Sequence, residues 1–346
     1  MAYTDIDKPS DYFETVLYAG NSGTQSITSL DFQPDWCWFK ARNNTDTHAV
    51  FDSVRGVTKR IIPDNTTAEG TQSNGLTHFL SNGFTVADAG ITNQGHNYVA
   101  WNWKAGTSVS GNTSGSGTAK AYSGSVNTDA GFSIIKYVGN GTSAHTIPHH
   151  LGAVPQWVLI KETSNASDWM GYHIGIGNTH TIKLNEPDAP VDRTDWWNDT
   201  TPTSSVVTLG DNGEINQNDT NYIMYSFSQK QGYSKFGSYT GNGNVDGTFF
   251  YTGFKPAFTI IRSTGSDQWS MFDAKRNPFN EVDNNIRANS NAAEADQANK
   301  EVDYLSNGVK LRTSSGEWNS SGTTYIYMAF AEQPFVTSTG VPATAR

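Results

Sequence analysis

Apolar and polar residues alternate with a period of two in several short runs of the chain, and Gly, Asn, Ser and Thr crowd the stretches between them. Such alternation is typical of β-strands, because successive side chains point to opposite faces of a sheet. The clearest of these runs lie at residues 12–18, 98–103, 132–137, 222–227, 233–239 and 325–330. The pattern predicts an all-β protein of antiparallel strands.

Three segments of the chain repeat the same landmarks in the same order. Each opens on a strand that ends in Tyr-x-Gly-Asn, at residues 18–21, 137–140 and 239–242. A Pro-x-aromatic step to a basic residue follows, then an aromatic run, a turn from Leu to Asn-Gly, and an alternating aromatic strand. The openings are 119 and 102 residues apart, whereas solenoid and propeller repeats run at roughly 20 to 50 residues. The repeats therefore predict three globular domains.

We expect each repeat to form an antiparallel β-sandwich. Such domains typically bury a few large aromatic side chains and have long polar loops between their strands. The predicted organisation is repeat 1 at 1–104, a linker at 105–131, repeat 2 at 132–231 and repeat 3 at 232–346. The linker is rich in Gly, Ser and Thr, so we expect it to be flexible or ordered only by its neighbours. Repeats 2 and 3 have no such linker and should dock rigidly.

The charge and composition of the chain exclude some classes of binding partner. Only 16% of residues are charged and the net charge is −10, which argues against nucleic acid, since a binder needs clustered Lys and Arg. Cys37 cannot form an internal disulfide, and its aromatic neighbours predict a buried strand position. No stretch looks like a secretory signal, and no apolar run approaches the roughly 18 residues of a membrane span. We therefore expect no membrane insertion, and assembly in a reducing bacterial cytoplasm.

One stretch brings acids and aromatic side chains together. Asp195, Trp196, Trp197 and Asp199 stand in a row of five residues with Asn198. Two indoles beside polar groups can stack against a sugar ring, so these four residues are the candidate glycan-binding residues. The competing interpretation, which we favour, is a loop that packs its Trp pair onto its own or a neighbouring domain. The other repeats lack the pair, so such a site would belong to repeat 2 alone.

Other groups of polar residues give no site. His145, His149 and His150 lie close together, but no Cys or carboxylate stands at metal-ligand spacing. Residues 211–219 are rich in oxygen ligands, but they miss the pattern of an EF-hand, and a hairpin turn on Asn-Gly explains them better. No nucleophile elbow, zincin motif or phosphate loop is present. We expect no enzyme activity, no cofactor and no metal.

An acid and an arginine recur in two of the three repeats. Asp52 and Arg55 in repeat 1 correspond to Asp273 and Arg276 in repeat 3, and repeat 2 has no counterpart. A functional pair should be present in every copy of a repeated site. We therefore expect a buried structural ion pair between strand ends.

The ordered motifs of repeat 1, and the stretch from residue 149 to residue 243, resemble an uncharacterised domain family abundant in tailed phages of marine bacteria. The resemblance covers almost the whole chain. It implies a virion protein, a tail fibre or tail-spike component, with lectin-like or jelly-roll-like β-sandwich domains. It supplies no catalytic residues.

On the basis of this resemblance we expect a bacteriophage virion structural protein of the phage tail, which acts in assembly and in attachment to the host surface. The expected partners are other tail or virion proteins, further copies of this chain in a homotrimer, and a bacterial surface glycan or protein. Repeated weak sites on one particle would strengthen attachment through effective concentration. Two alternatives remain: a capsid decoration or tail-scaffold protein without receptor contact, and a glycan-degrading depolymerase.

Overall fold

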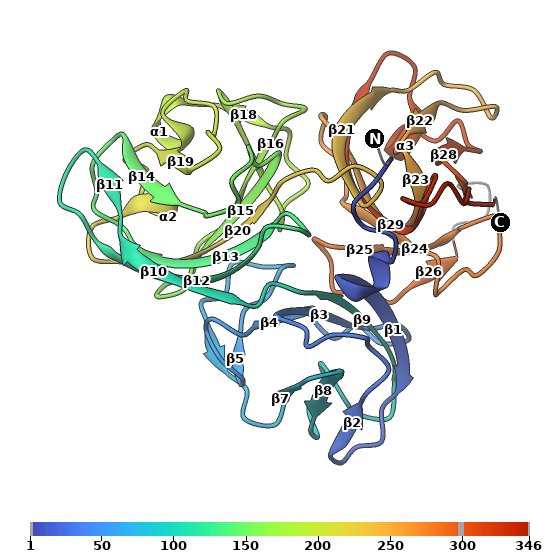
Figure 1. Cartoon of the computed structure of the whole chain (residues 1–346), viewed down its shortest axis with the longest axis horizontal. Coiled ribbons are helices and arrows are strands. Elements are labelled where there is room, and N and C mark those ends of the chain that lie inside the picture. The colour runs from blue at the N-terminus through green and yellow to red at the C-terminus, as the bar shows by residue number, and fades with distance from the viewer. Residues whose placement is uncertain (1–2, 297–300, 345–346) are drawn as a thin grey trace.

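The computed structural model describes residues 3–296 and 301–344, and over these ranges the chain forms antiparallel sheets with only short helical turns (Figure 1). The all-β prediction is confirmed. In the described ranges no helix has the length and apolar character needed to cross a membrane.

Each repeat is a continuous segment of the chain, and its large sheet contains no strand of another repeat. Repeat 1 contains η1 (Pro9–Asp11), β1 (Phe13–Ala19), β2 (Gln25–Ile27), β3 (Trp36–Ala41), β4 (Ala49–Asp52), β5 (Lys59–Arg60), β6 (Gly70–Thr71), β7 (Leu76–Leu80), β8 (Gly83–Val86) and β9 (Asn97–Trp103). Between repeats 1 and 2 lie β10 (Thr107–Asn112), β11 (Ser114–Gly115) and β12 (Ala121–Asn127).

Repeats 2 and 3 each end in a short helix followed by a closing strand. Repeat 2 contains β13 (Phe132–Val138), β14 (His145–Pro148), β15 (Trp157–Glu162), β16 (Trp169–His173), β17 (His180–Lys183), β18 (Val191–Asp192), α1 (Thr194–Trp197), β19 (Val206–Leu209), α2 (Gly213–Asn216) and β20 (Asn221–Phe227). Repeat 3 contains β21 (Ser234–Thr240), β22 (Phe249–Tyr251), β23 (Phe254–Ser263), β24 (Ser270–Asp273), β25 (Asn284–Arg287), β26 (Ala295–Asp296), β27 (Val302–Leu305), β28 (Gly308–Leu311), α3 (Gly316–Asn319) and β29 (Thr324–Pro334).

Each repeat builds its large sheet in the same order. The opening strand pairs with the closing strand, which pairs with the strand after the Pro-x-aromatic step, which pairs with the next strand. The orders are β1-β9-β3-β4, β13-β20-β15-β16 and β21-β29-β23-β24. A small sheet accompanies each large one, in the orders β2-β8-β7, β11-β14-β19 and β22-β28-β27. The sequence repeats are therefore structural repeats.

The Tyr-x-Gly-Asn signature is structural in all three copies. A Cβ on Gly20, Gly139 or Gly241 would lie 1.7 to 2.3 Å from a backbone oxygen, so no other residue fits there. The Asn backbone N–H that follows donates to a buried Asn side chain in each repeat, over 2.9 to 3.1 Å. The signature Tyr stacks on the first Tyr of the closing strand, with ring centroids 5.0 to 5.3 Å apart. The recurrence thus reflects folding, not a repeated ligand site.

The three large sheets share one hydrophobic core at the centre of the molecule, around which Figure 1 shows the three lobes arranged. Each closing strand contributes alternate residues to this shared core, for example Trp101 and Trp103 from β9, Tyr225 from β20 and Phe330 from β29. The residues between them face a separate core that belongs to their own repeat. The closing strands are therefore buried on both faces, whereas alternation alone suggests one buried face.

Polar contacts between repeats close a ring inside this core. Asp52 of repeat 1 accepts a hydrogen bond from the Tyr225 hydroxyl of repeat 2, over 2.6 Å. Asp273 of repeat 3 accepts from the Trp101 indole of repeat 1, over 3.1 Å. At the same position in repeat 2, His173 contacts the carbonyl of Tyr327 in repeat 3, over 3.1 Å. Each repeat thus bonds to the closing strand of the next.

The buried ion-pair prediction is confirmed. Arg55 Nε lies 2.5 Å from Asp52 Oδ2 and Arg276 Nε lies 2.5 Å from Asp273 Oδ2, and all four side chains are at most 1% exposed. Repeat 2 lacks the pair for a physical reason. The closing strand of repeat 3 carries Met328 where the other closing strands carry Trp101 and Tyr225, so an acid in repeat 2 would face no side-chain donor.

The basic residue after each Pro-x-aromatic step is also buried, and backbone carbonyls accept its hydrogen bonds. Lys161 donates to the carbonyls of Thr66 in repeat 1 and Ser167, over 3.3 and 2.9 Å. Arg262 of repeat 3 donates to the carbonyls of Lys183 and Glu186 in repeat 2, over 3.0 Å each. Burial lowers the pKa of Lys161 to about 8. Lys161 and Arg262 therefore join two repeats, whereas Lys40 donates to the carbonyls of Ala41 and Asn44 within repeat 1.

The predicted linker at 105–131 is different in the structure. Strand β10 pairs with β12, and β12 pairs with β13, so the segment extends the large sheet of repeat 2. Its low apolar content suits this edge, because most side chains of β10 are exposed. We expected this segment to be either flexible or ordered by its neighbours. The structure shows the second, because β10 and β12 pair within the sheet of repeat 2. Repeats 2 and 3 follow each other without a linker, as expected.

We predict that Asp273→Asn lowers the free energy of unfolding by about 3 to 5 kcal/mol, because it leaves the Arg276 charge buried without its partner. Urea denaturation measures the change. Asp219→Asn is the matched control: this acid pairs with Lys120 on the surface and its side chain is 71% exposed, so a loss below about 1 kcal/mol is expected. Equal losses in the two variants would contradict the structural role of the buried pair.

A second prediction concerns acid stability. The His173 ring is neutral: its Nε2 donates to the Tyr327 carbonyl and its Nδ1 accepts from the Gly175 N–H over 3.0 Å. Burial lowers the pKa of His173 to about 4, below the unfolded value of about 6.5. Between these values the unfolded chain binds more protons, so stability is complete above pH 6.5 and falls as the pH approaches 4.

His173→Gln keeps one donor and one acceptor but does not titrate, so its thermal midpoint should fall less than that of the wild type between pH 6.5 and 4. Thermal melts followed by circular dichroism over this range make the comparison. Parallel pH profiles would show that His173 does not control acid unfolding.

Candidate functional site

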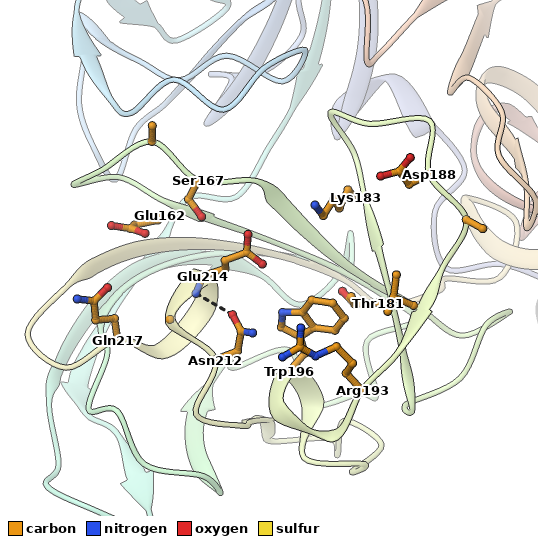
Figure 2. Close-up of a pocket in the computed structure, with 14 residues that line it drawn as sticks. Glu162, Ser167, Thr181, Lys183, Asp188, Arg193, Trp196, Asn212, Glu214 and Gln217 are labelled. Atoms are coloured by element: carbon orange, nitrogen blue, oxygen red, sulfur yellow. Dashed lines mark hydrogen bonds between the residues drawn. The ribbon is translucent and has the colours of Figure 1, made fainter.

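A cavity with convergent polar groups lies in repeat 2 and has a volume of about 620 Å³ (Figure 2). The loop after β15, strand β17, the loop before α1 and helix α2 surround it. Its polar lining consists of Glu162, Ser167, Thr181, Lys183, Asp188, Arg193, Asn212, Glu214 and Gln217, with Trp196 at one side. We call this cavity the repeat 2 pocket.

Two single-turn helices position the pocket side chains. Helix α1 carries Trp196 and ends at Asn198, which adopts the left-handed conformation with φ of 50°. Helix α2 begins after Asn212, whose side chain accepts a hydrogen bond from the Glu214 N–H over 2.9 Å. The expected hairpin turn at this Asn-Gly is therefore wrong, because Asn212 serves as a helix N-cap. The cap aims Glu214 into the pocket.

Trp196 lines the pocket but is only 4% exposed. The guanidinium carbon of Arg193 lies 5.2 Å from the centroid of the indole, so Arg193 covers one face of the ring. The indole N–H lies on the side of the ring that faces Glu214 (Figure 2) and reaches no acceptor with the geometry of a hydrogen bond. It is close enough to help stabilise the Glu214 carboxylate. Trp196 therefore offers the pocket a polar edge and not a stacking face.

The other three candidate glycan residues lie outside the pocket lining. Trp197 is 1% exposed and packs in the core of repeat 2, edge-on against Tyr172 with ring centroids 5.9 Å apart. Asp195 is bound by Arg193 at 2.5 Å and by the Asn212 amide at 2.9 Å. Asp199 is exposed. Both indoles belong to the core of repeat 2 and neither presents an exposed stacking face in this structure, which agrees with the favoured interpretation of a Trp pair packed on its own domain.

Two glutamates that the sequence did not single out as site residues, Glu162 and Glu214, line the pocket. Burial raises the pKa of Glu214, and the nearby Asp168 carboxylate raises it further. The charges of Lys183 and Arg193 act in the opposite direction on the pKa of Glu214, but neither forms an ion pair with it, and Lys183 is paired with Asp168. Glu162 is 5% exposed and accepts from the Asn165 side chain. Sequence reasoning noted residues 211–219 as oxygen-rich, and this was the available signal for Glu214.

The three histidines of residues 145–150 make separate contacts. His145 is fully buried between Asn216 and Thr113, at 2.8 and 2.7 Å. His149 contacts the Thr203 carbonyl at 3.2 Å, and His150 contacts the Tyr122 hydroxyl at 2.8 Å. Across residues 3–296 and 301–344, no group of three His, Cys, Asp or Glu side chains could hold a metal ion. The cluster is a set of structural hydrogen bonds.

Exposed aromatic side chains gather on one repeat. All ten tryptophans are buried. The exposed aromatic residues within the described ranges are Phe249, Tyr251 and Phe279, all in repeat 3, with exposures of 42%, 46% and 77%. Phe249 and Tyr251 share one face of β22, the edge strand of the small sheet, and Phe250 between them points into the core. Repeat 3 thus carries the aromatic surface of the chain.

The comparisons with known proteins identify a family. A family model described as a Domain of unknown function (DUF7483) matches residues 8–334. It spans all three repeats, in agreement with the closed ring and shared core. No curated protein matches the chain, and no solved structure matches it.

Proposed function

This chain belongs to the DUF7483 family, whose function is unknown, and we propose that it is a bacteriophage virion structural protein. It is a tail fibre or tail-spike component that acts in assembly and in attachment to the bacterial surface. The sequence resemblance to a family of tailed-phage proteins motivates the proposal. It is assembled in the host cytoplasm and works on the phage tail.

The observation that carries attachment is the confinement of exposed aromatic residues to repeat 3. A scaffold without receptor contact needs its aromatic surface between subunits, while an adhesin presents it at one end. Phe249 and Tyr251 stand side by side on an edge strand, where main-chain groups are also open to a partner. This surface suits contact with a bacterial glycan or protein.

The architecture supports a mechanical role. Each repeat is proposed to be an antiparallel β-sandwich of the lectin or jelly-roll type, in which the large and small sheets enclose a core of their own. The shared core and the ring of buried polar contacts join the repeats into one body. Such a body transmits force without internal hinges. A homotrimer remains part of the proposal, on the basis of what tail fibres usually form.

We predict that an antibody to this chain labels intact virions at the distal end of the tail in immunogold electron microscopy. Virions labelled with an unrelated antibody are the control. Gold over the head would instead indicate a capsid decoration protein, and gold along the tail shaft a tail-scaffold protein. Absence of gold from all particles would overturn the virion proposal.

A glycan-degrading depolymerase is the second candidate, because Glu162 and Glu214 line one pocket with Trp196. Glycoside hydrolysis uses two carboxylates across the scissile bond. We expect no release of reducing sugar from host polysaccharide by the wild-type chain, and none by Glu162→Gln or Glu214→Gln. Release by the wild type that Glu214→Gln abolishes, but Asp195→Asn and Asp199→Asn do not, would establish an enzyme in this pocket.

A further inference from the structure

We propose that the repeat 2 pocket binds a saccharide unit that carries a free ammonium group, with Glu214 as the carboxylate that receives it. This deepens the proposed attachment function, on which it rests for the source of the ligand. The argument comes from a comparison of repeat 2 with repeat 3 within the same chain.

The two repeats place an acid and a base at equivalent positions. Glu214 in α2 corresponds to Glu317 in α3, since each is the second residue of a helix that ends at a buried Asn with the same partners. Lys183 at the end of β17 corresponds to Arg287 at the end of β25, since both follow an Ile paired with the neighbouring strand. In repeat 3, Arg287 and Glu317 form an ion pair at 2.7 Å.

In repeat 2 the equivalent ion pair is missing, although both partners are present. Asp168 binds Lys183, and it also accepts from Asn185 over 2.7 Å. Repeat 3 has a neutral residue there: Gln268 accepts from Asn289 over 2.7 Å. The single acid Asp168 therefore holds Lys183 in an ion pair of its own, and Lys183 acts on Glu214 only as a more distant charge. In the described part of the chain Glu214 has no ion pair, and it lies in a cavity.

Two further groups that line the pocket lack hydrogen-bond partners. The Trp196 indole N–H belongs to a side chain that is 96% buried, and it approaches the Glu214 carboxylate without the geometry of a hydrogen bond. The Ser167 hydroxyl has no partner in the described part of the chain. Buried polar groups are normally satisfied, so each orphan needs an explanation such as a bound ligand. One donor and one hydroxyl beside a free carboxylate match a ligand that both donates and accepts hydrogen bonds.

The acidic residues of the pocket, which form no ion pair in the described part of the chain, favour a saccharide with a positive charge over an acidic or a neutral one. Lys183 and Arg193 are each occupied by an acid, Asp168 and Asp195. Glu162, Asp188 and Glu214 then remain to face the ligand. An acidic sugar would be repelled, and a neutral sugar would leave the carboxylates uncompensated. An ammonium group supplies to Glu214 the cation that Arg287 supplies to Glu317. The volume of about 620 Å³ is within the range of small-molecule sites.

The test is titration of the purified full chain with a glucosamine tetrasaccharide by isothermal calorimetry. The fully N-acetylated tetrasaccharide is the control probe, since acetylation removes every ammonium charge and adds an acetyl group at each nitrogen. We expect the amine form to bind at least tenfold more tightly than the acetylated form. Equal affinities, or no heat from either probe, would overturn the proposal.

Variants connect the binding to this pocket. Asp168→Gln installs the residue of repeat 3 and releases Lys183 to pair with Glu214, so the affinity for the amine form should fall at least tenfold. Glu214→Gln removes the receiving charge and should have the same effect. Glu317→Gln, at the equivalent position of repeat 3, is the matched control and should leave the affinity unchanged.

Circular dichroism of each variant checks that it is folded, and Glu214→Gln decides the question if Asp168→Gln does not fold. Unchanged affinity in a folded Glu214→Gln variant would overturn the pocket assignment. These binding results are independent of the gold labelling. No amine binding with gold at the distal tail would refute this inference alone, and amine binding with no gold on virions would refute only the virion proposal.

Discussion

The shared aromatic core is the constraint on which the rest of the structure depends. The closing strands β9, β20 and β29 bury both faces, one against their own repeat and the other against the other two repeats. A repeat taken alone would expose the second face, with large side chains such as Trp101 and Phe330 in water. When the three repeats close into a ring, the second face of each closing strand is buried against the other two repeats.

Burial on this scale forces the polar groups of the core to find partners. The acids Asp52 and Asp273 pair with arginines of their own repeat and bond to the next, while His173 uses a backbone carbonyl where Met328 offers no donor. An unpaired charge at these positions would cost several kcal/mol. The repeats therefore differ at this position because each one contacts a different residue on the closing strand of the next repeat.

The same comparison separates structure from ligand binding in repeat 2. Features present in all three copies, such as the Tyr-x-Gly-Asn turn, serve the fold. The pocket arises from what repeat 2 alone contains: the segment with α1, and Asp168 in place of a neutral residue. A single charge exchange changes an internal ion pair into a carboxylate that faces a cavity. Function is thus expected where the copies diverge.

The sequence by itself determined the all-β class, the threefold repeat, the structural role of the Gly-Asn turns and the buried Asp–Arg pairs. These follow from local rules: the period of two, the steric demand at Gly20 and its equivalents, and the cost of isolating a charge. Tertiary structure alone decided that the repeats share a core, that residues 107–127 join a sheet, and that Trp197 is buried while Glu214 faces a pocket. These depend on contacts between segments apart in the sequence, such as Lys183 with Asp168 and α2 with β15, which no local pattern encodes.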